Sequence, residues 1–449
     1  MTLTIDSLRP QVRGPVILPS DDAYDGTRRT FNAMLDKRPE VIVQPLDTAD
    51  VVAAVRWAAE SGLPVSIRGG GHSVAGHSVG DGSLMLDLAR MRGVEVDASA
   101  RLATVQGGAK LLDLDTATTA HGLAAPSGTY SDTGVGGLIL GGGISYLMGS
   151  RGLACDALVG ATLVMADGTV VEVDEAREPE LLWTLRGGSG NFGVVTSFRL
   201  ALGPIGEMYN ARLRFRGADA PALLERYFEF DAEAPDELTT QAVLWNAPDV
   251  GPGITLVGAW SGDPEQGVAA FAPFVAGFEP IEDLSRRLSY VELQQVFERM
   301  GADYRHYWKG QFVGRTDGGF VDALKASQSA LPAGHGIVLI EPMHGMVHRV
   351  PASSAAFGAR SAVANVSALA VWTDPGEDAA QIGWARDSVA GWEPWSLLGG
   401  GYVNYTPADE TAARIEQIYG AERFARLRAV KRRCDPDNRF RFNANIPPA

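Results

Sequence analysis

Three consecutive glycines, Gly69 to Gly71, follow the short β-branched segment 64–67 and end at His72. A strand that runs into glycines forms a loop whose N–H groups can converge on an anion, because no Cβ atom stands in the way. Arg68, at the start of this loop, can add charge-assisted hydrogen bonds to a pyrophosphate. A glycine run alone more often marks a tight turn, and a histidine beside it is commonly only a hydrogen-bonded polar group.

The first 200 residues or so alternate short apolar runs with glycine-rich loops, which predicts one α+β lobe. An Asp-Gly pair at 167–168 lies between two apolar runs and predicts a hairpin. Helices are expected at 51–60 and 111–121, and strands at 41–43, 64–67, 84–88, 93–96, 102–105, 158–164 and 170–173.

A second lobe is expected, because the chain has 449 residues and single cores stop growing near roughly 250–300. From about Gly203 the glycine clusters disappear and strand-like runs alternate with helical stretches. This pattern predicts a sheet covered on one side by helices, followed by a helical tail over 409–427. The strands are expected at 211–215, 242–245, 254–260, 337–342 and 362–372, and two of the helices at 219–233 and 317–331.

The charge balance argues against nucleic acid and membrane surfaces as partners. The chain carries 39 basic and 54 acidic residues, a formal net charge of −15, which repels phosphate backbones and anionic lipids. Two cysteines, Cys155 and Cys434, are too few for a disulfide scaffold. The start of the chain has no basic segment followed by an apolar core, so we expect a cytoplasmic enzyme.

Two common classes of enzyme fit the sequence poorly. The seven histidines form no recognised ligand motif with a neighbouring acid, so no metal is expected. The glycine loops contain no Gly-x-Gly-x-x-Gly that opens a helix and precedes an acid about twenty residues later, which argues against a nicotinamide cofactor.

Four ordered motifs resemble the berberine-bridge-enzyme-like branch of the vanillyl-alcohol-oxidase superfamily. The first is the loop 68–77 with its Gly-Gly-His-Ser, and the second spans 128–137 and continues to the glycines at 141–143. The third is 182–196, and the fourth comprises Tyr402-Val-Asn404-Tyr405, Lys431, 435–438 and 440–443. The resemblance covers nearly the whole chain and is weakest in its middle third.

The resemblance implies an α+β fold with a two-lobed PCMH-type FAD-binding domain at 1–203. It further implies a substrate domain at 204–400, with an antiparallel sheet covered by helices. A C-terminal segment at 401–449 would then return to the FAD domain. It also implies FAD bound covalently through its 8α-methyl group to His72. His77 can lie near the flavin or only cap its loop, and we weigh these alternatives equally. The residues expected to bind the cofactor are Arg68, Gly69, Gly70, Gly71, His72, Ser73, His77, Ser78, Gly128, Thr129, Thr133, Gly134, Gly137, Gly142, Val195, Asn404 and Asn443.

Two positions bear on how the cofactor is held and re-oxidised. Many relatives attach the flavin a second time through a cysteine, but Tyr130 occupies that place here, so attachment through His72 alone is expected. Thr133 occupies the position that gates oxygen in the resembled family, where a valine-sized side chain admits O2 and leucine blocks it. Threonine is close to valine in size, which favours an oxidase that produces H2O2; the alternative is a simple packing residue.

Hydride leaves a carbon more easily when a base removes a proton from the neighbouring heteroatom. Tyr402 and Tyr405 are the first candidates for that base, and the sequence leaves open which of them acts. Lys309 matches a lysine common in relatives and could stabilise a tyrosinate by its charge. Tyr130 is a further candidate. Where several relatives carry a carboxylate or glutamine, this chain has Asn365 and Ser367, so Glu341 and His344 remain as fallback candidates.

The favoured hypothesis is an FAD oxidase of a small aromatic, alkaloid-like or polyketide-like molecule, as in secondary metabolism, with O2 as the second substrate. The alternatives are a carbohydrate or oligosaccharide oxidase and, in a different class, a non-redox anion- or nucleotide-binding protein that would be colourless. The sequence leaves the oligomeric state open. Residues expected to wall the substrate pocket are Trp245, Trp260, Tyr304, Tyr307, Trp308 and Trp372.

Overall fold

The first of three layers in the N-terminal lobe is a small sheet built around a parallel pair. The computed structural model describes residues 5–247, 249–297 and 303–449. Strands β2 and β3 both pair in parallel with β4, and β1 adds an antiparallel edge. The helix α2 (Thr48–Ser61) connects β2 to β3; the Asp47 side chain caps its start and Gly62, at φ 71°, ends it. The strands are β1 (Val16–Ile17), β2 (Val41–Val43), β3 (Val65–Arg68) and β4 (Leu84–Asp87).

The second layer is a five-stranded antiparallel sheet in the order β5-β6-β10-β8-β9. The hairpin predicted at 158–173 is confirmed, since β8 and β9 pair from Gly160–Asp174 to Val164–Val170. Its strands are β5 (Val94–Asp97), β6 (Leu102–Gln106), β8 (Leu158–Val164), β9 (Val170–Asp174) and β10 (Val194–Ala201).

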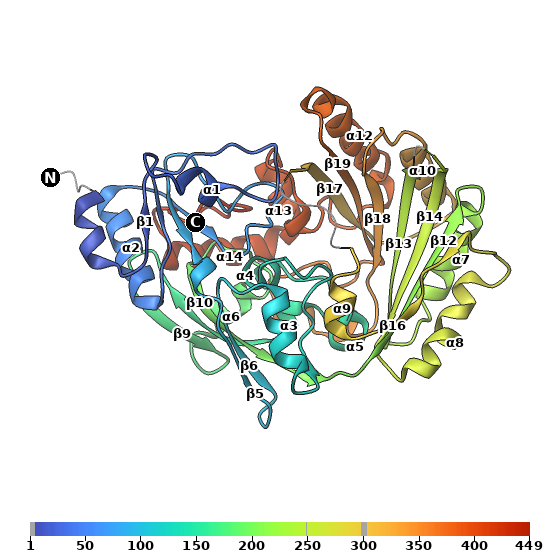
Figure 1. Ribbon diagram of the computed structural model, residues 1–449, viewed down its shortest axis with the longest axis horizontal. Coiled ribbons are helices and arrows are strands. Elements are labelled where there is room, and N and C mark those ends of the chain that lie inside the picture. Colours follow the sequence, from blue (N-terminus) through green and yellow to red (C-terminus); the bar gives the residue numbers. More distant parts are fainter. Residues whose placement is uncertain (1–4, 248, 298–302) are drawn as a thin grey trace.

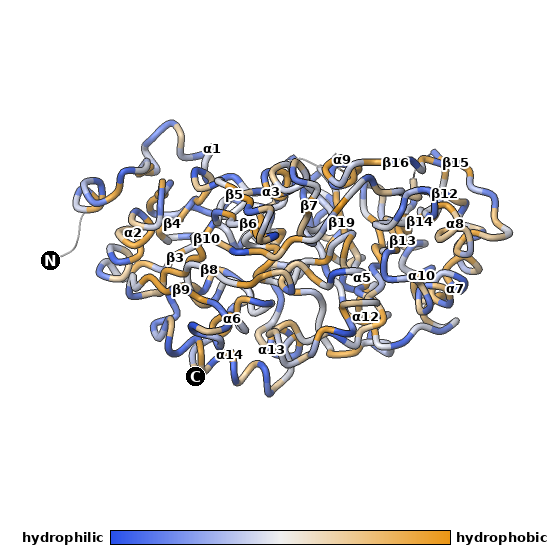
Figure 2. The backbone as a smooth tube through the Cα atoms, turned by 90° about the horizontal axis from the view of Figure 1, so that it is seen from below, coloured by the Kyte–Doolittle hydropathy of each residue, from blue (hydrophilic) through white to orange (hydrophobic). Residues whose placement is uncertain are grey.

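Short helices and the two-stranded β7–β11 pair complete the N-terminal lobe as its third layer. Their apolar side chains join one core with those of the five-stranded sheet. Figure 2 shows the apolar backbone stretches gathered along the interior strands and the hydrophilic ones in outlying loops. These elements are α3 (Leu111–Thr119), α4 (Val135–Leu140), α5 (Met148–Arg151), α6 (Pro179–Leu185), β7 (Leu123–Ala124) and β11 (Gly203–Pro204). The helix α1 (Tyr24–Arg28) lies instead against the small sheet, where Tyr24 packs with Ile17, Ile42 and Met85.

The second lobe is a large antiparallel sheet in the order β15-β12-β14-β13-β18-β19-β17, with β16 beside β12. The predicted strands of this lobe are all present, and the structure adds β17, which the sequence analysis did not predict. Its strands are β12 (Met208–Arg216), β13 (Leu238–Ala247), β14 (Gly251–Trp260), β15 (Glu282–Asp283), β16 (Arg286–Leu288), β17 (Arg305–Val313), β18 (Ile337–Pro342) and β19 (Ala364–Trp372).

Helices cover one face of this sheet, as predicted, and leave the other face toward the N-terminal lobe (Figure 1). The covering side carries the second core, in which aromatic residues such as Tyr227, Phe274 and Trp384 are buried. The covering helices are α7 (Ala220–Asp231), α8 (Pro264–Val275), α10 (Gly318–Ser329) and α12 (Asp378–Gly391), while α9 (Tyr290–Gln294) and α11 (Met346–Arg349) lie at the junction with the N-terminal lobe.

The C-terminal segment returns to the N-terminal lobe. The single helix predicted over 409–427 is wrong: Gly420, at φ 75°, separates α13 (Ala412–Tyr419) from α14 (Ala421–Cys434). Lys431, fully buried, pairs with Asp435 at 2.6 Å and donates to the carbonyl of Asn191 at 2.8 Å. These bonds fasten the end of the chain to the N-terminal lobe, whose core also includes side chains of α13 and α14.

No helix in the described part of the chain combines the length and apolar character that crossing a bilayer requires. Among the same residues, no cluster of histidine, cysteine and acidic side chains is arranged to hold a metal ion.

Candidate active site

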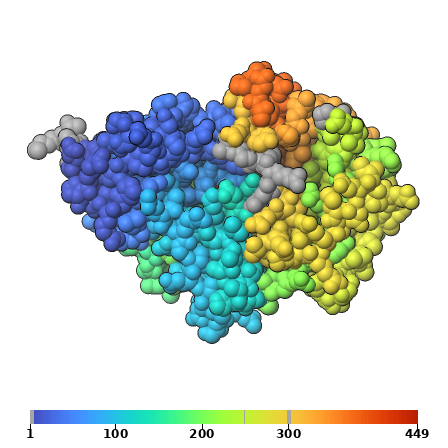
Figure 3. Space-filling model, in the orientation of Figure 1, coloured from blue at the N-terminus to red at the C-terminus, as the bar shows by residue number. Residues whose placement is uncertain are grey.

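A cavity of about 1470 Å³ lies between the two lobes. In the space-filling view the lobes meet along the border between blue-cyan and yellow-orange surfaces (Figure 3). Pockets for single small ligands usually have about 300–1,000 Å³, so this cavity has room for a cofactor and a substrate together. Its walls come from the loops around residues 69–78 and 129–140, the open face of the large sheet, and the C-terminal segment at 402–406 and 440–444.

The glycine loops form a cradle in which two backbones touch. A Cβ atom on Gly70 would lie 2.5 Å from the Cα of Gly134, and one on Gly134 would lie 2.7 Å from the Cα of Gly70. Only glycine permits this approach. Gly137 and Gly190 also line the cavity, and a Cβ atom there would meet nothing within 4 Å, so both open directly onto its space.

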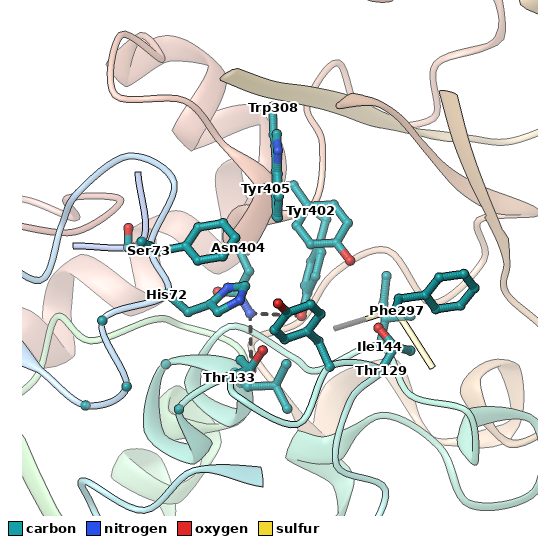
Figure 4. A pocket seen from close by; sticks show the side chains of 18 of the residues that line it. His72, Ser73, Thr129, Thr133, Ile144, Phe297, Trp308, Tyr402, Asn404 and Tyr405 are labelled. Atoms are coloured by element: carbon teal, nitrogen blue, oxygen red, sulfur yellow. Dashed lines mark hydrogen bonds between the residues drawn. The ribbon is translucent and has the colours of Figure 1, made fainter. Parts of the chain in front are cut away.

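His72 lies against aromatic rings at the edge of this cradle (Figure 4). Its imidazole stacks on Phe31 with ring centroids 4.0 Å apart, and the Tyr130 ring lies 5.1 Å away. Burial lowers the pKa of His72 to about 4, so the ring is neutral at pH 7. Its Nε2 is buried and has no hydrogen-bond partner among the residues that the structure describes. A neutral imidazole with an open nitrogen can form a bond to carbon.

His77 closes its loop and also lines the cavity. Its backbone N–H donates to Oγ of Ser73 at 3.1 Å, which closes the loop, while the residue also lines the cavity. Burial lowers the pKa of its imidazole to about 4.

Most of the residues predicted to bind the cofactor lie in the cavity wall, which brings together five parts of the chain that are far apart in sequence. Arg68 does not line the cavity; its guanidinium donates to the carbonyl of Thr27 and lies 3.7 Å from Asp87. Gly128 and Gly142 are likewise outside the lining. The predicted residues that line it are Gly69, Gly70, Gly71, His72, Ser73, His77, Ser78, Thr129, Thr133, Gly134, Gly137, Val195, Asn404 and Asn443.

The two candidate tyrosines have different partners. The hydroxyl of Tyr402 accepts hydrogen bonds from the N–H of Gly143 at 2.7 Å and from Nδ2 of Asn404 at 2.9 Å (Figure 4). The hydroxyl of Tyr405 instead faces a carboxylate, with its oxygen 3.5 Å from Oε1 of Glu341. Burial raises the pKa of both phenols above the ordinary value, so each is protonated at neutral pH.

Glu341, one of the two fallback candidates, is the buried acid that the Tyr405 hydroxyl faces. It is fully buried on β18, on the same face as Ile337 and Leu339, which line the cavity, although Glu341 and its neighbour Asn365 are not themselves among the lining residues. In the register of β18 and β19 it stands opposite Asn365, whose Nδ2 donates to its Oε2 at 2.8 Å. Burial raises the pKa of Glu341 to about 7.

The other candidates differ in their position relative to the cavity. Tyr130 lines it, but Lys309 lies outside the lining and pairs with Glu410 at 2.7 Å, because it alternates along β17 with the cavity-lining Trp308. The charge of Lys309 therefore does not face the candidate tyrosines across the cavity. His344 is buried outside the lining.

The predicted aromatic wall is only partly present. Trp245 and Trp308 line the cavity, whereas Trp260, Tyr304, Tyr307 and Trp372 do not. Strand alternation turns Tyr307 away from the face of Trp308, and its hydroxyl donates to Asp409 at 3.0 Å.

Sequence reasoning missed the polar residues that face the cavity from β12 and β13. Asn210, Arg212 and Arg214 line it from alternate positions of β12, and Gln241 lines it from β13, with Nε2 3.4 Å from Oε1 of Glu341. The sequence does contain a sign of this face, because polar residues occupy every second position of an otherwise apolar strand. Such alternation indicates that one face of the strand is turned toward a polar environment.

Comparisons with known proteins agree with this geometry. Residues 39–174 match the family model described as FAD binding domain, and residues 401–447 match Berberine and berberine like. FAD-linked oxidoreductase OXR1 of Pyricularia oryzae is 30% identical over 91% of this chain and 84% of its own. (R)-6-hydroxynicotine oxidase of Paenarthrobacter nicotinovorans is 29% identical over 97% of both chains. Xylooligosaccharide oxidase of Thermothelomyces thermophilus is 28% identical over 99% of this chain and 94% of its own.

A solved structure extends the likeness to the whole fold. The crystal structure of 6-hydroxy-D-nicotine oxidase from Arthrobacter nicotinovorans superposes with a TM-score of 0.90 at 28% identity, and 98% of each chain is covered. The PCMH-type arrangement of an FAD-binding domain and a sheet-containing second domain, which the sequence motifs implied, is confirmed by this match.

Proposed function

Since this chain belongs to the berberine-bridge-enzyme-like family of FAD-linked oxidoreductases, we propose that it is an oxidase with FAD bonded covalently to His72. Its substrate is a small aromatic or alkaloid-like molecule, which loses a hydride, and O2 is reduced to H2O2. The single observation that carries the covalent bond is the neutral, buried imidazole of His72, whose Nε2 has no hydrogen-bond partner in the described part of the chain.

The residues of the cavity fit FAD. The contact between Gly70 and Gly134 and the open sides of Gly137 and Gly190 make a cradle that a Cβ atom would fill. When bound, FAD supplies the acceptor for the two electrons of the substrate's C–H bond. Tyr130 stands where a cysteine would offer a second attachment, which supports a single bond through His72.

The proton acceptor in this proposal is the pair Tyr405 and Glu341. As the C–H bond breaks and its electrons leave as hydride, the substrate's O–H or N–H proton passes to the Tyr405 oxygen while the phenol proton moves to Glu341. The separation of 3.5 Å is long for an O–H···O bond, and such contacts commonly tighten when substrate binds. Asn365 holds Glu341 in place, and Tyr402 orders the Gly143 and Asn404 backbone regions that frame the cavity.

Two features support an oxidase of an apolar substrate. Thr133 lines the cavity with a side chain of valine size, as the oxygen-gate reading requires. The part of the sheet beside Tyr405 presents apolar side chains, including Trp308, Leu339 and Leu369. An oligosaccharide oxidase remains the second candidate, supported by the full-length likeness to xylooligosaccharide oxidase.

The covalent bond is tested by absorption spectra of the purified protein before and after acid precipitation and washing. We expect yellow colour to stay with the wild-type pellet and to move wholly to the supernatant in His72→Ala. His77→Ala is the matched control, because His77 is a second cavity-lining imidazole with a pKa lowered to about 4. Flavin released from the wild type would contradict the covalent bond, and a protein that takes up no FAD would contradict the whole proposal. Peroxide release then identifies substrates.

A further inference from the structure

The substrate end of the cavity has two unlike halves. Apolar side chains of β17, β18 and β19 line the half beside Tyr405. The other half, formed by β12, β13 and β16, is polar and carries arginines. Gln241 lies between the halves, since β13 pairs with β14 on one side and β18 on the other.

The charge of this second half opposes that of the whole protein. Among the described residues, four arginines, 212, 214, 286 and 287, line the cavity, against two acids, Glu282 and Glu292, in a chain of net charge −15; Arg287 also pairs with Glu265, which is outside the lining. Both acids are engaged locally: Glu282 pairs with Arg214 at 2.7 Å, and Glu292 accepts from the backbone N–H and the hydroxyl of Ser289 at 2.8 Å. A concave surface of excess positive charge concentrates anions.

Aromatic rings hold the two inner guanidinium groups in fixed planes. Arg212 stacks over Phe297 at 4.9 Å from the ring centroid, and Arg214 over Trp245 at 4.6 Å. The indole N–H of Trp245 donates to Thr255 at 2.9 Å, so this ring is itself anchored to β14. A stacked guanidinium is oriented in advance, and its fork of five donors suits a carboxylate better than a neutral group.

These arginines lie away from the segments that would hold the FAD phosphates. They project from β12 and β16 of the second lobe, whereas the cradle of Gly70, Gly134 and Gly190 belongs to the N-terminal lobe. In Figure 4, Phe297, over whose ring Arg212 stacks, lies on the side of the view opposite His72 and Ser73.

We infer that the substrate is an aromatic or otherwise apolar molecule that also carries an anionic group, such as a carboxylate. In this inference Arg212 binds the anionic group together with Arg214, which uses the donors left by its Nη1 bond to Glu282, while the carbon to be oxidised lies in the apolar half beside Tyr405. The inference rests on the proposed function, because only an oxidase has a substrate to orient here, but the anion site itself consists of second-lobe side chains.

Two probe molecules of the same shape, one anionic and one neutral, test this inference. The affinities of 2-naphthoate and 2-naphthamide for the flavin-loaded protein are measured by titration calorimetry at low ionic strength. We expect 2-naphthoate to bind about tenfold more tightly or better, as hydrogen bonds to charged partners provide, and the preference to shrink as salt is added. In Arg212→Gln/Arg214→Gln the preference disappears while 2-naphthamide binds as before, which shows that the cavity is intact.

Arg216→Gln is the matched control, because Arg216 follows on the same strand but is exposed and does not line the cavity. It retains the wild-type preference. Equal affinities of the two probes for the wild type, binding of neither, or a preference that survives in the double variant would each overturn the inference. The absorption spectrum of the same samples reports flavin separately, so a loss of flavin marks failure of the proposed function and not of the anion site.

Discussion

At the scale of single residues, the chemistry of the site depends on where one carboxylate is placed. Glu341 is fully buried, and in the described part of the chain its side-chain hydrogen-bonding partners are Asn365, Gln241 and Tyr405. None of these three carries a positive charge. Desolvation therefore dominates, and the pKa of Glu341 rises to about 7, which lets the group accept a proton near neutral pH.

Glu341→Gln should lower kcat/KM by about 10²–10⁴-fold, the usual contribution of a positioned general base. In the wild type kcat/KM should rise with pH through about 7, because the carboxylate must be ionised to accept the proton. The variant should lose this rise of kcat/KM with pH. Flavin reduction by a substrate found through peroxide release gives the measurement. Glu410→Gln, a change at a buried acid outside the cavity, should keep the wild-type profile. An unchanged profile in Glu341→Gln would exclude this residue as the proton acceptor.

At the scale of elements, the cradle depends on the loop after β3 lying against the start of α4. The amide and Cα of Gly134 occupy the space that a side chain at Gly70 would need. Neighbouring hydrogen bonds fix the Gly134 side, since the N–H of Leu111 donates to the carbonyl of Thr133 and that of Val135 to the carbonyl of Ala109, both at 2.9 Å. The Gly134 segment therefore cannot move away from Gly70 without disturbing the start of α3 as well.

Gly70→Ala should impair both flavin loading and thermal stability, because its Cβ atom would lie 2.5 Å from the Cα of Gly134. Gly137→Ala is a matched control for folding: its Cβ atom meets nothing within 4 Å, so the thermal midpoint should hold while the added methyl group intrudes on the cavity. The ratio of flavin to protein absorbance and the unfolding midpoint report the two effects. A Gly70→Ala protein that loads flavin and melts like the wild type would refute the close approach.

Sequence periodicity was sufficient for the strands and helices whose apolar residues repeat clearly, such as the hairpin of β8 and β9. It failed for β17, where Arg305, Lys309 and Gln311 interrupt the apolar pattern on one face. It also missed the helix break at Gly420, because the sequence around a glycine in a charged helical stretch does not indicate whether that glycine has a positive φ. Most of the residues that the motifs predicted to bind the cofactor do line the cavity. The motifs could not rank Glu341 above Asn365, because that choice depends on the register between β18 and β19, which local sequence does not encode.

At the scale of the whole molecule, a buried polar network joins the lobes beside the cavity. Asp115 on α3 accepts from the hydroxyl of Ser127 at 2.7 Å, and Ser127 contacts the hydroxyl of Tyr290 on α9 at 2.9 Å. Nε2 of Gln294 donates to Ser127 at 2.9 Å and to Tyr290 at 3.1 Å. In Figure 1, α3 and α9 lie side by side where the lobes meet. Because Asp115 is fully buried, desolvation raises its pKa to about 8.

Asp115 should make the junction of the lobes sensitive to pH. An aspartate in the unfolded chain titrates near about 4. Between about pH 4 and 8 the folded protein therefore keeps a proton that the unfolded chain has lost, and the stability that this proton contributes falls as pH rises toward 8. In Asp115→Asn, which keeps the shape and the hydrogen bond to Ser127, the thermal midpoint should fall less between about pH 5 and 8 than in the wild type. Asp113→Asn, on the same helix but bonded to Arg92 near the surface, should retain the wild-type slope. Equal slopes for Asp115→Asn and the wild type would mean that Asp115 is ionised in the folded protein, and the lobes would then meet across a buried charge.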